Sequence, residues 1–326
     1  MPLPKNFYLT TLLKNATNIL IVCHQRPDGD TLGSGLCLYF LAKALNKNPY
    51  IVSDSEVPSQ YGFMQGIEHL NADYKKIKFD LTIVVDCADS LRMGKFQDYA
   101  KSTLSVNIDH HKTNDRFAKY NVVDENASST CQLVYSILKT EKLFADKSIP
   151  KETKAIMATS LMVGLSTDTG HFMHSSVDSK VLETATELSK LGANIHEISS
   201  NIYRSRSKEK VLLLSKALSN LRFFNDDQIC IMSLTLKDFE TASQSPLDTE
   251  GFIDFGLSIK STMVSVTITQ SEENFYKVSF RSKGIDVSRV ASVFGGGGHT
   301  RAAGCAVHGK YEDVKDKVLK AIRDEL

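Results

Sequence analysis

The sequence predicts an α/β protein with two domains, the first built on a mostly parallel sheet with flanking helices and the second a smaller α/β unit. Short apolar runs alternate with helical patterns over the first two thirds of the chain, which favours parallel strands joined by helices. Near residue 226 the pattern changes to closely spaced strands and a closing helix. The length of 326 residues also exceeds what one hydrophobic core usually serves.

The first domain is expected to contain four buried strands. "NILIVC" is a continuous apolar run of strand length. "PYIVSD", "DLTIVVD" and "LSVNID" repeat the pattern further along the chain. We therefore predict strands at residues 18–23, 49–54, 80–86 and 104–109.

Helical patterns accompany these strands. The first has small residues on the face nearest the sheet, and the second has Ser128 or Ser129 as its N-cap. The last is amphipathic and ends at Gly192. We predict helices at residues 31–46, 128–143, 151–170 and 175–192.

The domain division follows from a change of character after residue 192. Residues 1–192 form the first domain, 193–225 a helical and charged linker, and 226–326 the second domain. In the second domain "QICIMSLTL", "TMVSVTITQ" and "FYKVSFRS" predict strands, and "YEDVKDKVLKAIRDEL" predicts the closing helix. A glycine cluster between them is expected to be a ligand-binding turn.

Composition excludes several classes of protein. The 39 basic and 38 acidic residues give a formal net charge of +1, so no global field attracts long nucleic acid. The N-terminus lacks the pattern of a signal peptide, and no apolar run approaches the ~20 residues that span a bilayer. The six cysteines form no CxxC pair, which suits reduced thiols. We expect a cytoplasmic protein without a membrane partner.

Acids and histidines gather where the predicted strands or helices end. Because the carboxyl ends of parallel strands meet at one edge of a sheet, these groups can converge in one site. Carboxylates and imidazoles without thiolates suit Mn²⁺, Fe²⁺ or Mg²⁺ rather than a structural zinc. The four clusters are His24 with Asp28 and Asp30, Asp86 alone, Asp109 with His110 and His111, and Asp168.

Each cluster alone also has an ordinary explanation. Asp28 and Asp30 flank a glycine and could form a surface turn. Asp86 could cap a helix. The combination of four clusters at element ends is what favours a metal site, in which one carboxylate shared by two cations would hold them about 3.5–4 Å apart.

The motifs around these residues identify a family. "HQRPDGDTLGS", "VVDCAD", "NIDHHKTN" and "STDTGHF" resemble, in this order, the four signature motifs of the DHH phosphoesterase family. "GGGGHTRAAG" resembles the glycine-rich motif of the DHH-associated C-terminal domain. "YKVSFRSKGIDVSRVASVFGGGGH" is similar to the nano-RNase and pAp-phosphatase-like branch. The resemblance covers nearly the whole chain, and we expect the active site in the cleft between the two domains.

The resemblance implies two metal ions, normally Mn²⁺, with Fe²⁺, Co²⁺ or Mg²⁺ as alternatives. His24, Asp28 and Asp86 would hold one ion, and Asp30, Asp86, His110 and Asp168 the other, which makes Asp86 the bridge. Asp109 would orient a histidine by a hydrogen bond. His111 would contact the scissile phosphate or give a proton to the leaving oxygen.

The C-terminal domain would supply substrate binding. Glycines let a backbone approach a phosphate closely, and their amides can form an anion-binding nest. An arginine fork matches a phosphate with two parallel hydrogen bonds. The expected substrate-binding residues are Arg281, Gly296, Gly297, Gly298, His299 and Arg301.

The resemblance therefore implies a manganese-dependent hydrolase. Its substrates would be short RNA oligonucleotides and dinucleotides such as pApA, cut to 5'-mononucleotides, and 3'-phosphoadenosine 5'-phosphate, converted to AMP. Cyclic di-AMP hydrolysis is the nearest alternative. An inorganic pyrophosphatase is disfavoured because its C-terminal domain lacks the GGGGH signature, and a non-catalytic nucleotide sensor because every expected ligand is present. Oligomeric state stays open, with a homodimer as one option.

Some residues have no assigned role. Arg92 either makes a structural ion pair or touches the phosphate, and His171 and His174 are either loop histidines or base contacts. A processive exonuclease would need a basic groove with aromatic platforms. The chain has no tryptophan and no charge excess, so this class is disfavoured.

Overall fold

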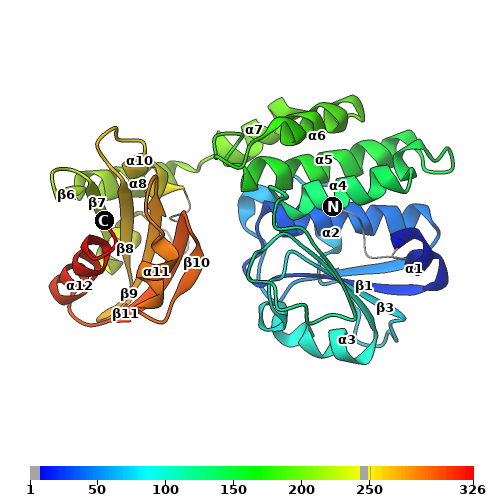
Figure 1. The fold of residues 1–326 in the computed structure, drawn as a ribbon, viewed down its shortest axis with the longest axis horizontal. Helices are drawn as coiled ribbons and strands as arrows, with labels where there is room; N and C mark the ends of the chain where they lie inside the picture. Colours follow the sequence, from blue (N-terminus) through cyan, green and yellow to red (C-terminus); the bar gives the residue numbers. More distant parts are fainter. Residues whose placement is uncertain (1–7, 243–248, 250) are drawn as a thin grey trace. The chain divides into compact units, whose positions relative to one another are not determined.

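The computed structural model describes residues 8–242, 249 and 251–326, so the first seven residues of the segment judged for a signal peptide lie outside the described part. The chain divides into two compact units, Met1–Ser205 and Arg206–Leu326 (Figure 1). The boundary falls inside the segment expected as a linker. Within the described ranges, no helix has the length and apolar character needed to cross a bilayer.

The first unit contains a five-stranded sheet in the order β2-β1-β3-β4-β5, and every neighbouring pair is parallel. This confirms the predicted fold class. Four strands were expected and are present, whereas β5 was missed because its short sequence, YNVV, starts with two polar residues. The strands are β1 (Asn18–Cys23), β2 (Asn48–Val52), β3 (Leu81–Val85), β4 (Leu104–Asp109) and β5 (Tyr120–Val123).

Helices cover both faces of this sheet (Figure 1). On one side lie α1 (Leu9–Asn15), α2 (Gly29–Ala44), α4 (Thr130–Thr140), α5 (Lys151–Asp168), α6 (Ser179–Lys190) and α7 (Ile195–Tyr203). On the other lies α3 (Gln97–Ser102). Short 3-10 turns occur at η1 (Ser59–Tyr61), η2 (Ile67–His69), η3 (Ser90–Phe96) and η4 (Leu143–Ala145).

Successive residues of β1 enter different cores, which explains its unbroken apolar sequence. Ile19 and Ile21 pack in the large core with α2, α4 and α5. Leu20 and Val22 pack in a smaller core with Phe96. A strand covered on both faces has no position for a polar side chain.

Two helix starts, those of α2 and α6, differ from the sequence expectation because side-chain caps fix them elsewhere, whereas one of the two expected caps of α4 is confirmed. α2 begins at Gly29, since the Asp28 carboxylate accepts hydrogen bonds from the backbone N–H groups of Asp30 and Thr31. Ser129, rather than Ser128, caps α4 by accepting from Gln132 N. α6 begins at Ser179, where Asp178 is the cap.

The second unit contains a mixed six-stranded sheet in the order β10-β11-β9-β8-β7-β6. Only the β7–β8 pair is parallel among its described neighbours. Its strands are β6 (Arg222–Phe224), β7 (Ile229–Leu234), β8 (Val264–Glu272), β9 (Phe275–Ser282), β10 (Gly297–His299) and β11 (Ala302–His308). Its helices are α8 (Lys208–Ser219), α9 (Leu236–Ala242), α10 (Phe252–Leu257), α11 (Val287–Ser292) and α12 (Tyr311–Arg323).

The sequence predicted a turn at the glycine cluster, and part of the cluster forms a strand. Gly297, Gly298 and His299 form the edge strand β10, which pairs antiparallel with Ala302–Gly304 of β11. A Cβ atom on Gly298 would lie 2.5 Å from Ala302 O, and its φ of +146° also favours glycine. The hairpin therefore requires glycine at this position, and the expected turn is flanked by a paired edge strand.

Candidate metal centre

The ends of three parallel strands and of two helices carry the candidate ligands. His24 follows β1, and Asp28 and Asp30 lie at the start of α2. Asp86 follows β3, and Asp168 is the last residue of α5. The DHH run begins at Asp109, the last residue of β4.

The structure brings the predicted ligands together in one cluster. Within each of three sets, the potential ligand atoms all lie within 4.8 Å of one another. The sets are His24 with Asp28 and Asp86, Asp30 with His110 and Asp168, and Asp86 with His110 and His111. Asp86 belongs to two of the sets, and so does His110.

The two oxygens of Asp86 face different histidines. Oδ2 lies 3.3 Å from His24 Nε2, and Oδ1 lies 3.7 Å from His110 Nε2. The two imidazoles also have carboxylates of their own: Asp28 Oδ1 is 3.7 Å from His24 Nε2, and Asp168 Oδ2 is 3.1 Å from His110 Nε2. A carboxylate flanked in this way has the placement of a bridging ligand.

The hydrogen bonds of the two imidazoles point the correct nitrogen at the cluster. His24 Nδ1 lies 2.7 Å from the carbonyl oxygen of Gln25, and His110 Nδ1 lies 3.2 Å from that of Ala127. A carbonyl only accepts, so each Nδ1 carries a proton in the neutral ring. Each Nε2 is then left with a lone pair, which is the usual arrangement of a metal-binding histidine.

One buried atom shows that the donor set fits a cation. His24 Nε2 is fully buried and has no hydrogen-bond partner of acceptable geometry, although two carboxylates flank it. A buried polar atom without a partner is costly. A divalent ion coordinated by the nitrogen and the carboxylates would satisfy all three groups, and oxygen and imidazole donors suit Mn²⁺, Fe²⁺ or Mg²⁺.

The charges of the cluster are strongly coupled. Burial acts to lower the pKa of His24, but the carboxylates of Asp28 and Asp86 outweigh it and raise the pKa to about 10. Burial is outweighed at His110 too, where Asp168 dominates and the pKa rises to about 11. Burial raises the pKa of Asp168 to about 6, although His110 acts in the opposite direction. Without metal, protons on the imidazoles balance the carboxylates.

The start of α4 holds two of the carboxylates. Thr130 N donates to Asp30 Oδ2 at 2.6 Å, and Cys131 N donates to Asp30 Oδ1 at 2.8 Å. The Thr130 hydroxyl donates to Asp86 Oδ1 at 2.9 Å. These contacts span 44 to 101 sequence positions, so sequence reasoning missed the role of Thr130 in positioning Asp30 and Asp86.

Two glycines allow the helices to meet around Asp30. A Cβ atom on Gly164 of α5 would lie 2.7 Å from Asp30 Oδ1 and 2.3 Å from Cys131 Sγ. A Cβ atom on Gly33 of α2 would lie 2.3 Å from Ser160 O of α5. Neither glycine has a positive φ, so close packing is what requires them.

His111 differs from the other two histidines of the site. Its Nδ1 lies 2.7 Å from Asp109 Oδ1, so the carboxylate sets the orientation of the ring. Asn114 Nδ2 donates to Asp109 Oδ2 at 2.6 Å and to Cys87 O at 3.0 Å. Burial would raise the pKa of Asp109, but His111 and Asn114 outweigh it and lower the pKa. Asn114, the last residue of the NIDHHKTN motif, is thus a further positioning residue.

The predicted substrate-binding residues lie on neighbouring strands of the second unit. His299 pairs with Ala302, and Ala302 pairs with Arg281 of β9. Arg301 lies in the turn between β10 and β11, where Nη1 donates to Ile285 O at 3.1 Å. Gly296 precedes β10, and a Cβ atom there would lie 2.3 Å from Gly304 O.

Gly297 differs from its neighbours. A Cβ atom there would meet nothing within 4 Å, and its φ is not positive. The hairpin does not require glycine at this position, so the absence of a side chain leaves the adjacent space open. The roles of the six predicted substrate-binding residues stay predictions. They are Arg281, Gly296, Gly297, Gly298, His299 and Arg301.

The unassigned residues have defined places in the first unit. The Arg92 carbonyl accepts a hydrogen bond from Gln25 N, one residue after His24. His174 Nδ1 lies 3.1 Å from the carbonyl oxygen of Asp168. His171 lines a separate pocket beside α7.

Comparison with known proteins agrees with this geometry. Residues 18–165 match the DHH family, N-terminal domain, and residues 241–326 match the DHHA1 domain. The chain is 31% identical over 310 residues to the bifunctional oligoribonuclease and PAP phosphatase NrnA of Thermus thermophilus, covering 94% of this chain and 90% of that one. It is 27% identical over 305 residues to the protein of that name from Bacillus subtilis, covering 92% of each.

A solved structure is similar over nearly the whole chain. It is an exopolyphosphatase-related protein from Bacteroides fragilis, with a TM-score of 0.88 and 27% identity, covering 97% of this chain and 94% of that one. Together with the 31% identity to the Thermus protein, the ordered motifs give the conclusion that the chain belongs to the DHH family and carries a DHHA1 domain.

Proposed function

We propose that the protein is a divalent-metal-dependent phosphodiesterase that cuts short oligoribonucleotides and dinucleotides to 5'-mononucleotides, and that converts 3'-phosphoadenosine 5'-phosphate to AMP. The observation that carries this proposal is the cluster in which Asp86 presents one oxygen to each of His24 and His110. The names of the relatives, bifunctional oligoribonuclease and PAP phosphatase, support the substrate class.

The proposed ligands form two sets around Asp86. His24, Asp28 and Asp86 would hold one ion, and Asp30, Asp86, His110 and Asp168 the second. Mn²⁺ is the proposed ion for both positions. Divalent ions held there would act as Lewis acids toward a phosphate and neutralise its charge.

The chain's own residues supply the proton transfer. Because Asp109 accepts from His111 Nδ1, the ring is held in one orientation with Nε2 directed away from that carboxylate. Held in this orientation, His111 would give a proton from Nε2 to the leaving oxygen. Asn114 keeps Asp109 in place.

The second unit is proposed to bind the terminal part of the substrate. The Arg281 and Arg301 guanidinium groups would contact phosphate oxygens, and the amides of Gly296–Gly298 with His299 would add further donors. An open position at Gly297 lets a ligand approach the backbone.

A substrate panel tests the proposal. The protein with Mn²⁺ is incubated with pApA, cyclic di-AMP, 3'-phosphoadenosine 5'-phosphate, pyrophosphate and RNA oligomers of increasing length, and the values of kcat/KM are compared. We expect pApA, the shortest oligomers and 3'-phosphoadenosine 5'-phosphate to give the highest values. Faster hydrolysis of long RNA would contradict the short-substrate proposal, and a preference for pyrophosphate would contradict the phosphodiester chemistry.

A further inference from the structure

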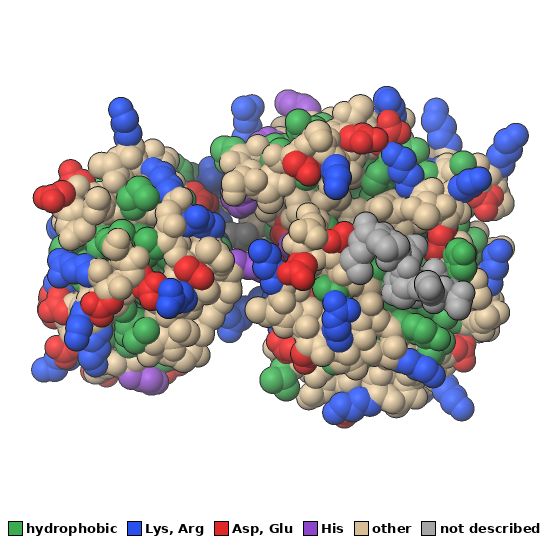
Figure 2. Space-filling model, viewed as in Figure 1, with side chains coloured by type: hydrophobic (Ala, Val, Ile, Leu, Met, Phe, Trp, Pro, Cys, Tyr) green, Lys and Arg blue, Asp and Glu red, His purple; other side chains and the backbone are tan. Residues whose placement is uncertain are grey.

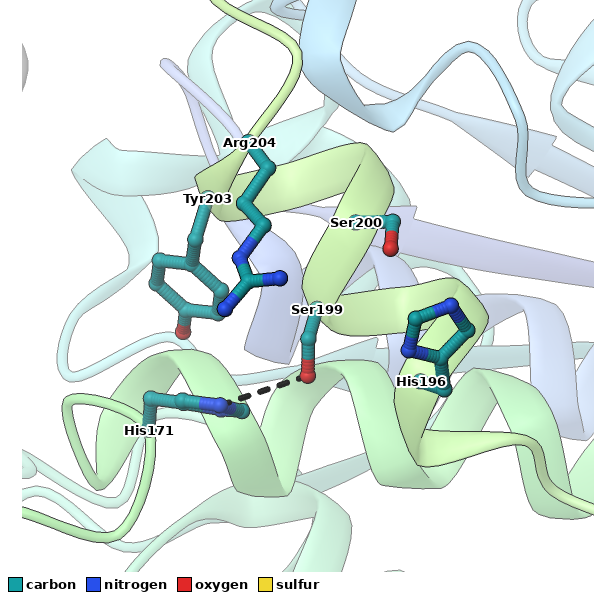
Figure 3. Close-up of a pocket in the computed structure, with 6 residues that line it drawn as sticks. All are labelled: His171, His196, Ser199, Ser200, Tyr203 and Arg204. Atoms are coloured by element: carbon teal, nitrogen blue, oxygen red, sulfur yellow. Dashed lines mark hydrogen bonds between the residues drawn. The ribbon is translucent and has the colours of Figure 1, made fainter.

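A polar pocket lies beside α7 in the first unit, and none of its residues belongs to the proposed metal ligands (Figure 3). Its volume is about 310 Å³. The lining residues are His171, His196, Ser199, Ser200, Tyr203 and Arg204.

The sequence of α7 builds most of this pocket. His196, Ser199, Ser200 and Tyr203 are spaced i, i+3, i+4 and i+7, so they lie along one face of the helix. Ile198 on another face is buried in the main core. The buried side chain of Ile198 therefore holds α7 against the main core, and the opposite, polar face of the helix lines the pocket.

His171 enters the pocket from an unusual turn after α5. Gly170, His171 and Phe172 all have left-handed backbone angles, with φ of +56°, +57° and +64°. Only glycine adopts such angles without cost, so the turn is strained at two residues. Strain of this kind persists at positions where a side chain must be held in one place.

The turn fixes the His171 ring against three partners. Nδ1 lies 3.1 Å from Ser166 Oγ and Nε2 lies 3.2 Å from Ser199 Oγ, while the ring centroid is 4.7 Å from that of Tyr203. The hydrogen bond to Ser199 is visible in Figure 3. The ring forms a rigid, polar wall of the pocket.

The charge of the lining selects the ligand. Among the described residues, no carboxylate lines the pocket, whereas one arginine and two histidines do. In the part of the chain that is described, the Arg204 guanidinium has no ion pair, and Figure 3 shows it extending along α7 toward Ser199 and His171. The Ser199 hydroxyl donates to Ile195 O at 2.7 Å, so the Arg204 guanidinium and the Ser200 hydroxyl are the groups that match the oxygens of a phosphate.

The pocket is connected to the metal centre through the last turn of α5. The Tyr203 hydroxyl donates to Ser166 O at 3.2 Å, and Ser166 also contacts His171. Asp168, a proposed ligand, lies two residues further along the same helix. We propose that the pocket is a phosphate subsite for an oligonucleotide whose scissile phosphate lies at the metal centre.

The phosphate in the pocket would be the one that follows the scissile phosphate along the oligonucleotide. This part of the inference rests on the proposed function. If the second unit holds the terminal phosphate and the metal centre holds the scissile one, pApA has no third phosphate for the pocket. The trinucleotide pApApA has one. Arg204 would therefore contribute to the selection of substrate length.

Binding of inorganic phosphate tests the pocket without reference to any activity. The histidine side-chain signals of the metal-free protein are followed by NMR during a phosphate titration, and the His196→Gln variant assigns the His196 signal. We expect this signal to shift in the wild type and to stay unchanged in Arg204→Gln. No shift in the wild type, or an equal shift in the variant, would overturn the inference.

Kinetics then test which phosphate is bound. For Arg204→Gln we expect the ratio of kcat/KM for pApApA over pApA to fall by about ten- to a hundredfold, as for loss of a charged hydrogen bond. Arg323→Gln, which removes an exposed guanidinium from α12, should keep the wild-type ratio. An unchanged ratio in Arg204→Gln overturns the third-phosphate assignment. If the wild type hydrolyses neither oligomer, the proposed function fails, and the NMR titration alone decides on the pocket.

Discussion

The two units present their candidate functional residues in opposite ways. In the first, His24, Asp30 and Asp86 are at most 2% exposed and are held by backbone and side-chain contacts. In the second, His299 and Arg301 are exposed on the hairpin at the edge of the sheet. Figure 2 shows charged side chains of both signs spread over the visible surface of the molecule. The difference suggests chemistry in the buried cluster and substrate capture on the exposed hairpin, which mutations can separate.

The largest effect is expected for Asp86→Asn. The amide keeps the size of the side chain but removes the charge that faces both His24 and His110, so both proposed ions would lose a ligand. We expect kcat with Mn²⁺ to fall by about 10⁴-fold or more, with less metal bound per chain by elemental analysis. Asp98→Asn, an exposed aspartate of α3, should retain activity and metal content. Wild-type activity in Asp86→Asn would remove the basis for the bridge.

A smaller loss is expected for His111→Gln. This variant removes the proton donor but leaves the proposed ligands in place, so kcat should fall by about 10²- to 10⁴-fold while metal content stays normal. Loss of metal together with activity would show that His111 acts as a ligand, as its place in one set of potential ligand atoms permits.

Arg301→Gln tests the exposed side of the comparison. We expect KM for pApA to rise by about ten- to a hundredfold with kcat changed little, because an arginine fork binds phosphate before and during the reaction alike. Arg323→Gln serves as the control for lost positive charge. A fall in kcat at unchanged KM would place Arg301 in the chemical step and abolish the division between the units.

Metal affinity is expected to depend steeply on pH. Because the pKa values of His24 and His110 are raised to about 10 and 11, both imidazoles are protonated at neutral pH without metal, and each must lose a proton to coordinate. Affinity should thus rise by about tenfold per pH unit for each histidine below its pKa. Calorimetric titration with Mn²⁺ in buffers of different ionisation enthalpy measures the protons released. Release of none would contradict both histidines as ligands.

The same shifts fix the sign of the stability change in the metal-free protein. Protonated His24 stabilises the folded state fully below its unfolded pKa of about 6.5, and this contribution is lost as the pH rises through about 10. Saturating Mn²⁺ should reduce that loss, because coordination replaces the proton at Nε2.

The sequence predicted the first unit well because its chemistry follows its topology. A candidate ligand that directly follows a buried parallel strand, such as His24 or Asp86, must lie at the carboxyl edge of the sheet. The strands themselves were recognisable because both faces are covered. β5 was missed because YNVV offers too short an apolar pattern.

The contacts that hold the site were beyond sequence reasoning. No spacing indicates that the amides of Thr130 and Cys131 reach Asp30, since only the packing of α2 against α4 and α5 brings them there. The sequence did not predict strand β10, because a run of glycines indicates a loop by composition. The strand forms because Gly297–His299 pairs with β11. The sequence left His171 open between a loop histidine and a base contact, because the left-handed turn that directs its ring has no signature except Gly170.

The close approach of helices at Gly33 and Gly164 has a consequence for the mobility of the site. Because no space separates α2, α4 and α5 around Asp30, the cluster cannot open without separating helices that form the main core. The amides of Thr130 and Cys131 should therefore exchange with deuterium only through global unfolding, whereas edge amides near Gly297 should exchange by local fraying. Fast exchange at Thr130 would show that the cluster opens locally, without global unfolding. With slow exchange at Thr130 and Cys131, the first unit would keep its geometry between turnovers, while the hairpin adapts to each ligand.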